Sequence, residues 1–180
     1  MVVFDASILL LFFAPDTRPP LDSATGDPVT RCKDRVEHLV STFESERTRV
    51  IVPTPVLSEI LVRAGEAGVA YLETLNSSVH FKIVPFDTRA AVELAAMTHE
   101  AIGSGDKKGG SASPWTKVKF DRQIIAIART EGAETIYSDD EGIHRFATQA
   151  GIEVIGTGQL PLPPEDPQAS LFGQRPGEEE

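Results

Sequence analysis

The sequence contains very little cysteine, because Cys32 is the only one in the chain. A lone cysteine excludes an internal disulfide framework and any zinc site built from several cysteines, and it fits a reducing, cytoplasmic setting. Long apolar runs are missing too. The opening segment 1–15 is interrupted by Asp5 and falls short of the roughly 18 residues of a membrane span. It also lacks the basic start and cleavage site of a signal peptide. We therefore expect neither a signal peptide nor a membrane span.

Basic residues are few, since the chain has 17 of them against 27 acidic residues, and its net charge is −10. This balance argues against non-specific coating of nucleic acid, which needs a basic surface. It does not exclude a nucleic-acid enzyme whose acidic side chains hold metal ions. One stretch is locally basic and flanks Asp121; it contains Lys107, Lys108, Lys117, Lys119 and Arg122. Lys119 and Arg122 are its members nearest to Asp121. These two cations are candidates for contacts to substrate phosphates, and a solvated loop is the alternative.

Several catalytic motifs are absent from the sequence. It has no Gly-x-Ser-x-Gly elbow, no phosphate-binding P-loop and no glycine-rich dinucleotide fingerprint after the first strand. The four histidines show no paired metal-binding spacing. Serine hydrolases, P-loop enzymes and dinucleotide enzymes are therefore disfavoured.

What the sequence does contain is an alternation of strand and helix patterns. Short apolar runs predict five strands, at 2–4, 50–52, 80–86, 135–138 and 152–155. Helical spacing predicts helices at 6–13, 31–47, 67–76, 88–102, 119–131 and 141–150, and a further helix that Thr54 caps. The alternation favours one α/β domain with a parallel sheet over residues 1–157. Residues 158–180 are expected to be a Pro-rich, acidic and disordered tail.

Acidic residues follow two of the predicted strands and lie near the starts of two predicted helices. Asp5 ends the first strand, and the pair Asp139 and Asp140 follows the fourth. Glu59 lies at the edge of an apolar helix stripe, and Asp121 lies in the first turn predicted for its helix. Sites in parallel sheets form beyond the carboxyl ends of the strands. We therefore expect these carboxylates to converge there.

Converging carboxylates repel one another, and a cation or a proton must relieve the repulsion. Mg²⁺ and Mn²⁺ take oxygen ligands and can activate water for attack on a phosphodiester. Each acid alone also has a plain structural explanation. Asp5 and the Asp139–Asp140 pair could be turn or capping residues, and Glu59 could be a solvated helix-edge residue. Asp121 could be placed near a helix start because the helix dipole stabilises a negative charge there. The set as a whole favours a metal site.

Four segments, in this order, resemble the PIN-domain ribonucleases and notably the VapC-type toxins of toxin–antitoxin pairs. They read VVFDAS, TPVLSEIL, KFDRQIIAIA and IYSDDEGIHRFA, and the resemblance covers about residues 1–157. It implies a PIN-like three-layer α/β sandwich with a central parallel sheet flanked by helices. It also implies Mg²⁺- or Mn²⁺-dependent endonucleolytic cleavage of RNA.

The resemblance assigns roles to individual residues. Asp5, Glu59, Asp121 and Asp140 match the family's catalytic acids. Asp5, Asp121 and Asp140 would bind the metal, with Asp139 as an additional ligand. Ser7 and Ser138 match small hydroxyl residues near the acids, where Ser7 could orient Asp5 or cap the following helix. The implied partners are RNA, a small antitoxin protein and a second copy of the chain.

Two other readings stay open. A PIN-like module could bind RNA or a protein without cutting, although all four acids are retained. A receiver-like phosphoacceptor domain also gathers acids and Mg²⁺. That fold needs its acid pair after the first strand, whereas here the pair follows the fourth.

Overall fold

The computed structural model describes residues 1–14, 16–22 and 25–164, and its centre is a five-stranded sheet. All neighbouring strands are parallel, which confirms the predicted sheet type. The spatial order is β3-β2-β1-β4-β5. The strands are β1 (Val2–Phe4), β2 (Val50–Pro53), β3 (Phe81–Val84), β4 (Thr135–Tyr137) and β5 (Glu153–Ile155).

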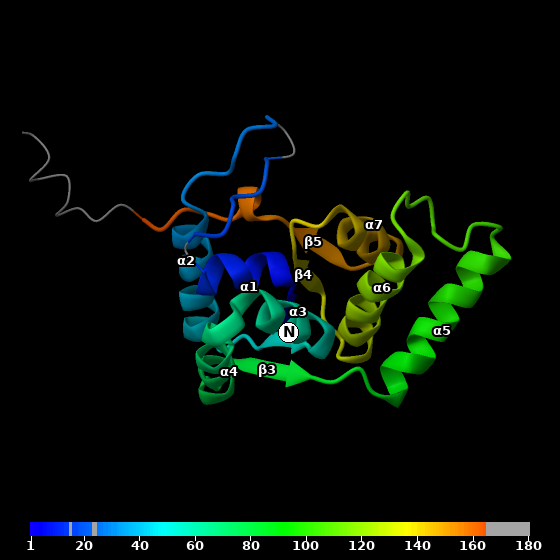
Figure 1. Cartoon of the computed structure of the whole chain (residues 1–180), viewed down its shortest axis with the longest axis horizontal. Coiled ribbons are helices and arrows are strands. Elements are labelled where there is room, and N and C mark those ends of the chain that lie inside the picture. The colour runs from blue at the N-terminus through cyan, green and yellow to red at the C-terminus, as the bar shows by residue number, and fades with distance from the viewer. Residues whose placement is uncertain (15, 23–24, 165–180) are drawn as a thin grey trace, which may run out of the picture.

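Helices cover the sheet and make up most of the remaining structure (Figure 1). The first group connects β1 to β3 and comprises α1 (Ala6–Phe13), α2 (Cys32–Glu46), α3 (Thr54–Ala64), the short 3₁₀ helix η1 (Gly65–Ala67) and α4 (Gly68–Ser77). The second group follows β3 and comprises α5 (Thr88–Gly103), α6 (Trp115–Thr130), α7 (Glu141–Gln149) and the 3₁₀ helix η2 (Thr157–Gln159). A central parallel sheet flanked by helices is the PIN-like three-layer arrangement that the resemblance implied.

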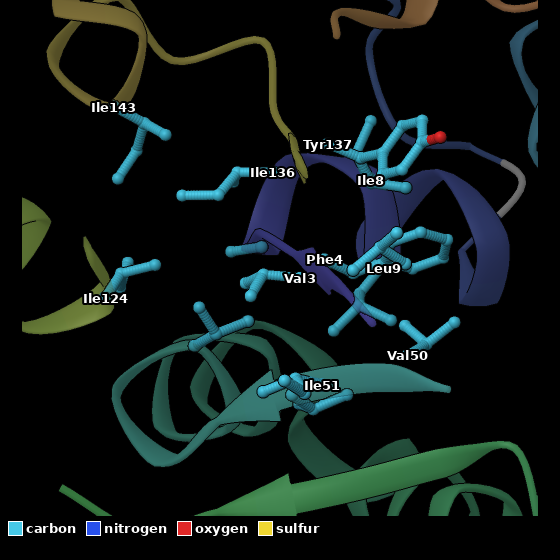
Figure 2. Packing of buried hydrophobic residues seen from close by; sticks show 14 of the residues in the cluster. Val3, Phe4, Ile8, Leu9, Val50, Ile51, Ile124, Ile136, Tyr137 and Ile143 are labelled. Atoms are coloured by element: carbon cyan, nitrogen blue, oxygen red, sulfur yellow. The ribbon is translucent and has the colours of Figure 1, made fainter. Parts of the chain in front are cut away.

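The core lies where the central strands meet the first helix (Figure 2). All three residues of β1 and all four of β2 are buried. Strands covered by helices on both faces read as continuous apolar runs, which explains why these segments do not alternate. The segment 8–13 packs on this core within the chain. Ile8 and Leu9 are fully buried, and Phe13 stacks on Tyr71 with ring centres 4.5 Å apart.

The strand order places the ends of β1 and β4 side by side. From β1 the chain adds β2 and β3 on one side of β1 and then crosses to place β4 and β5 on the other. Such a reversal is the switch point at which open parallel sheets bind ligands. Asp5 N–H donates to the Tyr137 carbonyl at 3.0 Å, so the residues just past β1 and β4 are in direct contact.

Two helix starts differ from prediction. Pro53 rather than Thr54 is the N-cap of α3, and Thr54 Oγ1 instead accepts a hydrogen bond from Phe86 N–H at 3.1 Å. Asp87 rather than Thr88 caps α5, because its carboxylate accepts from Ala90 N–H at 2.9 Å. Asp87 caps α5 through its side chain, whereas Pro53 makes no side-chain cap at α3.

Helix α6 begins at Trp115, four residues before the predicted start at 119. Pro114 is the N-cap, and the fully buried Val118 anchors the first turn. Asp121 therefore lies in the second turn of α6 and not in the first, so helix-start electrostatics does not account for it.

Helix α5 is less buried than its apolar residues predict. Val92 is 66% exposed, Ala91 and Ala95 are also exposed, and only Ala90 is buried. The reason is its position, since α5 packs against α6 at one end of the molecule and not on the sheet (Figure 1).

The folded part continues beyond the predicted boundary at residue 157. Thr157 and Leu160 are buried, and the Leu160 carbonyl accepts a hydrogen bond from the Arg35 guanidinium. The segment 157–160 therefore packs against α2, in contrast to the expectation that the chain from 158 on forms a tail. Most of the predicted tail, residues 165–180, lies outside the described residues. No described helix is both long and apolar enough to cross a membrane.

Candidate functional site

A pocket of about 620 Å³ lies at the switch point and is lined by all five predicted acids. Its walls come from the start of α1, from α3, from α6 and from the turn between β4 and α7. The acidic lining residues are Asp5, Glu59, Asp121, Asp139 and Asp140. The fold thus brings together side chains that are up to 135 residues apart in the sequence.

Asp5 is buried at the carboxyl end of β1 and is held by two serine hydroxyls. Ser138 Oγ donates to Asp5 Oδ2 at 2.8 Å, and Ser7 Oγ donates to the same oxygen at 3.3 Å. Each serine also accepts a backbone N–H from the turn after β4: Asp140 N–H at 3.0 Å for Ser138 and Asp139 N–H at 3.1 Å for Ser7. Ser7 therefore orients Asp5, and this role is favoured over the alternative of a helix cap.

Asp121 and Asp140 share one cation, the ammonium group of Lys117. Its Nζ lies 3.1 Å from Asp121 Oδ1 and 2.9 Å from Asp140 Oδ2. Lys117 and Asp121 are four residues apart on α6, so both point to the same side of the helix. Asp140 Oδ1 meanwhile caps α7 by accepting from Gly142 N–H at 2.8 Å and Ile143 N–H at 3.1 Å. Asp140 is therefore both a capping residue and part of the pocket.

The electrostatics of the pocket differ from acid to acid. Burial raises the pKa of Asp5, although the Ser138 hydrogen bond opposes the rise. Burial also raises the pKa of Asp121 to about 6, because the shared Lys117 does not offset burial and the nearby charges of Asp140 and Asp5. Burial acts in the same direction on Asp140, but Lys117 and the two α7 N–H groups outweigh it and lower its pKa. Around Asp5, Asp121 and Asp140 the pocket thus concentrates negative charge that the Lys117 ammonium only partly neutralises.

Glu59 reaches the pocket from α3 together with a cation that sequence reasoning missed. Arg63 lies one turn further on, and its Nη2 is 2.9 Å from Glu59 Oε1. The Glu59 side chain is 34% exposed, so it stands at the open side of the pocket. The i, i+4 spacing of Glu59 and Arg63 was a signal for this pair in the sequence.

The carboxylate of Asp139 makes its hydrogen bonds to the segment after β5. Its carboxylate accepts from Thr157 N–H at 2.7 Å and from Thr157 Oγ1 at 2.6 Å. Both oxygens therefore form hydrogen bonds with Thr157 in η2, although Asp139 also lines the pocket. Its expected role as an additional metal ligand stays a prediction. The contact attaches the segment after β5 to the turn after β4.

Lys119 and Arg122 do not line the pocket, in contrast to their expected contact with substrate at this site. On α6 only residues at helical spacing from Asp121 can share its face, and these include Lys117 and Ile124. Lys119 is exposed and faces the side of α5. Arg122 is buried between α6 and α7.

Gly142 is a further residue that sequence reasoning missed. A Cβ atom at this position would overlap Asp121 Oδ2 and would lie 2.9 Å from Asp140 Oδ1. The absence of a side chain therefore lets the two carboxylates approach the first turn of α7. Its place two residues after Asp140 was the only signal in the sequence.

The donor set suits a hard divalent cation, since Asp5, Asp121 and Asp140 offer carboxylate oxygens at one pocket. The cation that lies between two of these donors is Lys117, which shows that the position attracts positive charge. Within the described ranges, no three acidic, histidine or cysteine side chains are already arranged as a metal site. An ion would therefore have to compete with the Lys117 ammonium.

Comparison with known proteins finds the same fold in toxin–antitoxin proteins. VapBC2 from Rickettsia felis, solved with a promoter DNA fragment, matches with a TM-score of 0.57 and 12% identity over 87% of this chain and 98% of that one. DNA-bound VapBC from Salmonella typhimurium matches with a TM-score of 0.55 and 17% identity, over 87% of this chain and 97% of that one. VapC20 from Mycobacterium tuberculosis is a toxin that cleaves the sarcin–ricin loop. It matches with a TM-score of 0.52 and 17% identity, over 84% of this chain and 96% of that one.

No family model and no curated protein sequence matches the chain. The likeness is therefore one of structure, and it extends over nearly the whole described region. A five-stranded parallel sheet in the order β3-β2-β1-β4-β5, with acids gathered at its switch point, gives the chain the PIN fold of VapC-type toxins.

Proposed function

We propose that this protein is a metal-dependent endoribonuclease that cleaves RNA phosphodiester bonds, acts in the cytoplasm and serves as the toxin of a toxin–antitoxin pair. The observation that carries the proposal is the pocket at the switch point, where Asp5, Asp121 and Asp140 converge and a cation already bridges two of them. The likeness to VapC20, a toxin that cleaves an RNA loop, supports RNA as the substrate class.

Asp5, Asp121 and Asp140 would hold Mg²⁺ or Mn²⁺, with Glu59 completing the acidic wall. When bound, the ion would supply an activated water and stabilise charge on the phosphate. Ser7 and Ser138 keep the Asp5 carboxylate in position through their hydrogen bonds. Lys117 holds Asp121 and Asp140 together, and its ammonium would be near enough to the acids to attract a substrate phosphate. Arg63 stands at the open side, where it can contact RNA.

The direct test is a cleavage assay on mixed RNA with Mg²⁺ or Mn²⁺. We expect Asp5→Asn, Asp121→Asn and Asp140→Asn to lose at least about a hundredfold in rate, since electrostatic stabilisation of this kind is worth several kcal/mol. Asp139→Asn is the matched control, because it lies beside Asp140 but is bound to Thr157. RNA binding by the three inactive variants should fall less than cleavage, as fewer carboxylates then repel the phosphates.

The outcome separates the two readings of the fold. Equal rates in wild type and all three variants would contradict the carboxylate mechanism. A wild-type protein that binds RNA and never cuts it would support the alternative, a PIN-like module without catalysis.

We extend the proposal to two protein partners. The Rickettsia and Salmonella structures are VapBC proteins, which supports a small antitoxin that covers the acidic pocket. A second copy of the chain is the other proposed partner, giving a homodimer.

We expect induced expression of the wild-type protein to arrest the growth of the host cells, and induced expression of Asp121→Asn not to arrest it. Co-expression of a small reading frame directly upstream should relieve the arrest. A monomer in sedimentation across micromolar concentrations would contradict the homodimer.

A further inference from the structure

Arg122 is a buried cation that forms no ion pair with a carboxylate of the described residues. It follows Asp121 on α6 but points to a different side of the helix, and only 3% of its surface is exposed. Its Nη1 is buried and donates no hydrogen bond to any part of the described chain. The Asp106 carboxylate acts electrostatically on the guanidinium but is not in ion-pair contact with it. A buried guanidinium in this state is rare, because arginine is almost never fully buried unless it is paired.

The neighbours of Arg122 are mostly aromatic. The guanidinium carbon lies 5.0 Å from the Phe146 ring centre and 5.8 Å from the Trp115 ring centre. Ring faces attract a cation, but they accept no hydrogen bonds of ordinary strength and carry no net negative charge. The cost of taking an ion out of water exceeds what such contacts return, and it is offset well only by an opposite charge with good hydrogen-bond geometry. The guanidinium therefore lacks an anion in direct contact.

A cavity of about 280 Å³ adjoins Arg122 and lies between α5, α6 and α7. Its walls include Met97, Ser104, Gly109, Arg129 and Gln149. Arg129 already has a partner, since its Nη1 lies 2.9 Å from Glu93 Oε1. The one acidic wall residue, Glu100, is exposed. The volume is just below the roughly 300–1,000 Å³ of sites for drug-sized ligands, so it suits a small ligand or one group of a larger one.

The loop before α6 closes over the guanidinium through Gly109. This residue has φ +58°, and a Cβ there would lie 3.1 Å from the Phe146 ring and 3.4 Å from Arg122 Nη2. Only glycine lets the backbone come this near. The same loop adds a cation, because Lys107 Nζ lies 4.1 Å from the centre of the Trp115 ring that Arg122 also contacts. The Trp115 ring is therefore flanked by two cations, Lys107 and Arg122, and the same loop carries the carboxylate of Asp106.

We propose that this cavity is a binding site for a phosphate group, held by Arg122 and separate from the acidic pocket. A guanidinium binds phosphate through N–H···O hydrogen bonds, which would give Arg122 the contacting negative charge that it lacks. Because Nη1 is closed off from solvent, the guanidinium would have to turn toward the cavity for Nη1 to join this contact. The phosphate could belong to a free ion or mononucleotide, or to the backbone of a bound RNA. The inference does not depend on nuclease activity or on a metal.

The test uses Trp115, the only tryptophan of the chain, as a reporter beside Arg122. The metal-free protein is titrated with inorganic phosphate at constant ionic strength, with chloride as the reference. We expect a saturable change in Trp115 emission and a rise in Tm of several degrees. Arg122→Met should lose both responses, and its Tm in chloride should equal or exceed that of wild type. Lys119→Met is the matched control, since it removes one exposed charge from the same helix and should keep both responses.

A second variant introduces a negatively charged side chain into the cavity itself. Met97→Glu places a carboxylate on the cavity wall, so it should raise Tm in chloride and weaken the phosphate response at least tenfold. An oligoribonucleotide without a terminal phosphate distinguishes the two sources: a response through Arg122 indicates a backbone phosphate, and a response to inorganic phosphate alone indicates a free ion or nucleotide. The proposal is overturned if wild type responds equally to phosphate and chloride. It is also overturned if Met97→Glu lowers Tm and leaves the phosphate response intact.

Discussion

The ammonium group of Lys117 lies 2.9 Å from Asp140 Oδ2, and this ion pair joins the first turn of α6 to the N-cap of α7. The same ammonium contacts Asp121, so it stands between two of the three proposed metal ligands. Asp140 and Asp121 hold Lys117 in the charged form and raise its pKa against the effect of burial. A metal ion at the proposed site would therefore have to displace this ammonium, and its affinity would depend on Lys117.

Replacing Lys117 by methionine removes the competing cation and keeps the length of the side chain. We expect Mn²⁺ to bind Lys117→Met roughly tenfold more tightly than wild type, because breaking partly exposed ion pairs costs about 1 kcal/mol. Without metal the variant should melt at a lower temperature, since Asp121 and Asp140 then repel each other. Calorimetric titration and thermal unfolding measure the two effects, with Lys119→Met as the control. Equal Mn²⁺ affinities in all three proteins would show that Lys117 does not compete.

Asp121 should make the metal-free protein less stable as the pH rises. Its pKa is raised from 3.8 to about 6 in the folded state, so the unfolded chain releases the proton first. The stability is fully present below pH 3.8 and is lost as the pH passes through 6. Relative to Asp121→Asn, the free energy of unfolding should fall by up to about 3 kcal/mol between about pH 3 and pH 7. Urea unfolding across this range measures it, and a constant difference would contradict the prediction. Saturating Mn²⁺ should reverse the loss.

Gly142→Ala should disturb the carboxylates while leaving the fold intact. The added Cβ would overlap Asp121 Oδ2, so that carboxylate must move away from Asp140. We expect the rate of RNA cleavage to fall roughly ten- to a hundredfold, because small displacements of positioned groups are costly in catalysis. Gly103→Ala is the matched control, since a Cβ at the end of α5 meets nothing within 4 Å. A cleavage rate that Gly142→Ala leaves unchanged would show that the carboxylates adapt without loss.

Asp139→Ala should affect stability and not chemistry. It removes two short hydrogen bonds to Thr157, of which one involves the backbone N–H. Losing a charged acceptor of this kind costs about 2 kcal/mol, so we expect a lower free energy of unfolding and cleavage within a few-fold of wild type. Thr157→Val, which removes only the hydroxyl donor, should cost about half as much. A severe loss of cleavage in Asp139→Ala at full stability would support Asp139 as a metal ligand.

Much of the local structure could be predicted from the sequence. The continuous apolar runs at 2–4 and 50–52 indicated strands buried on both faces, and the helical spacing of Val36, Leu39, Val40 and Phe43 indicated the buried face of α2. These patterns report on burial within a short segment, which each segment's own residues determine. The acids at the ends of β1 and β4 were visible for the same reason.

Only the tertiary structure decided which of these residues meet. Asp5 and Ser138 form a hydrogen bond across 133 positions because β1 and β4 are neighbours in the sheet, and no local pattern specifies that pairing. Asp139 and Asp140 make different contacts because of the direction of the turn after β4. The Asp139 side chain contacts Thr157, and the Asp140 side chain contacts Lys117. The sequence by itself determined where strands, helices and carboxylates occur. The pairing of β1 with β4 and the packing of α6 beside α7 determined which carboxylates share the Lys117 ammonium. They also left Arg122 without a carboxylate in contact, because both outcomes depend on segments far apart in the chain.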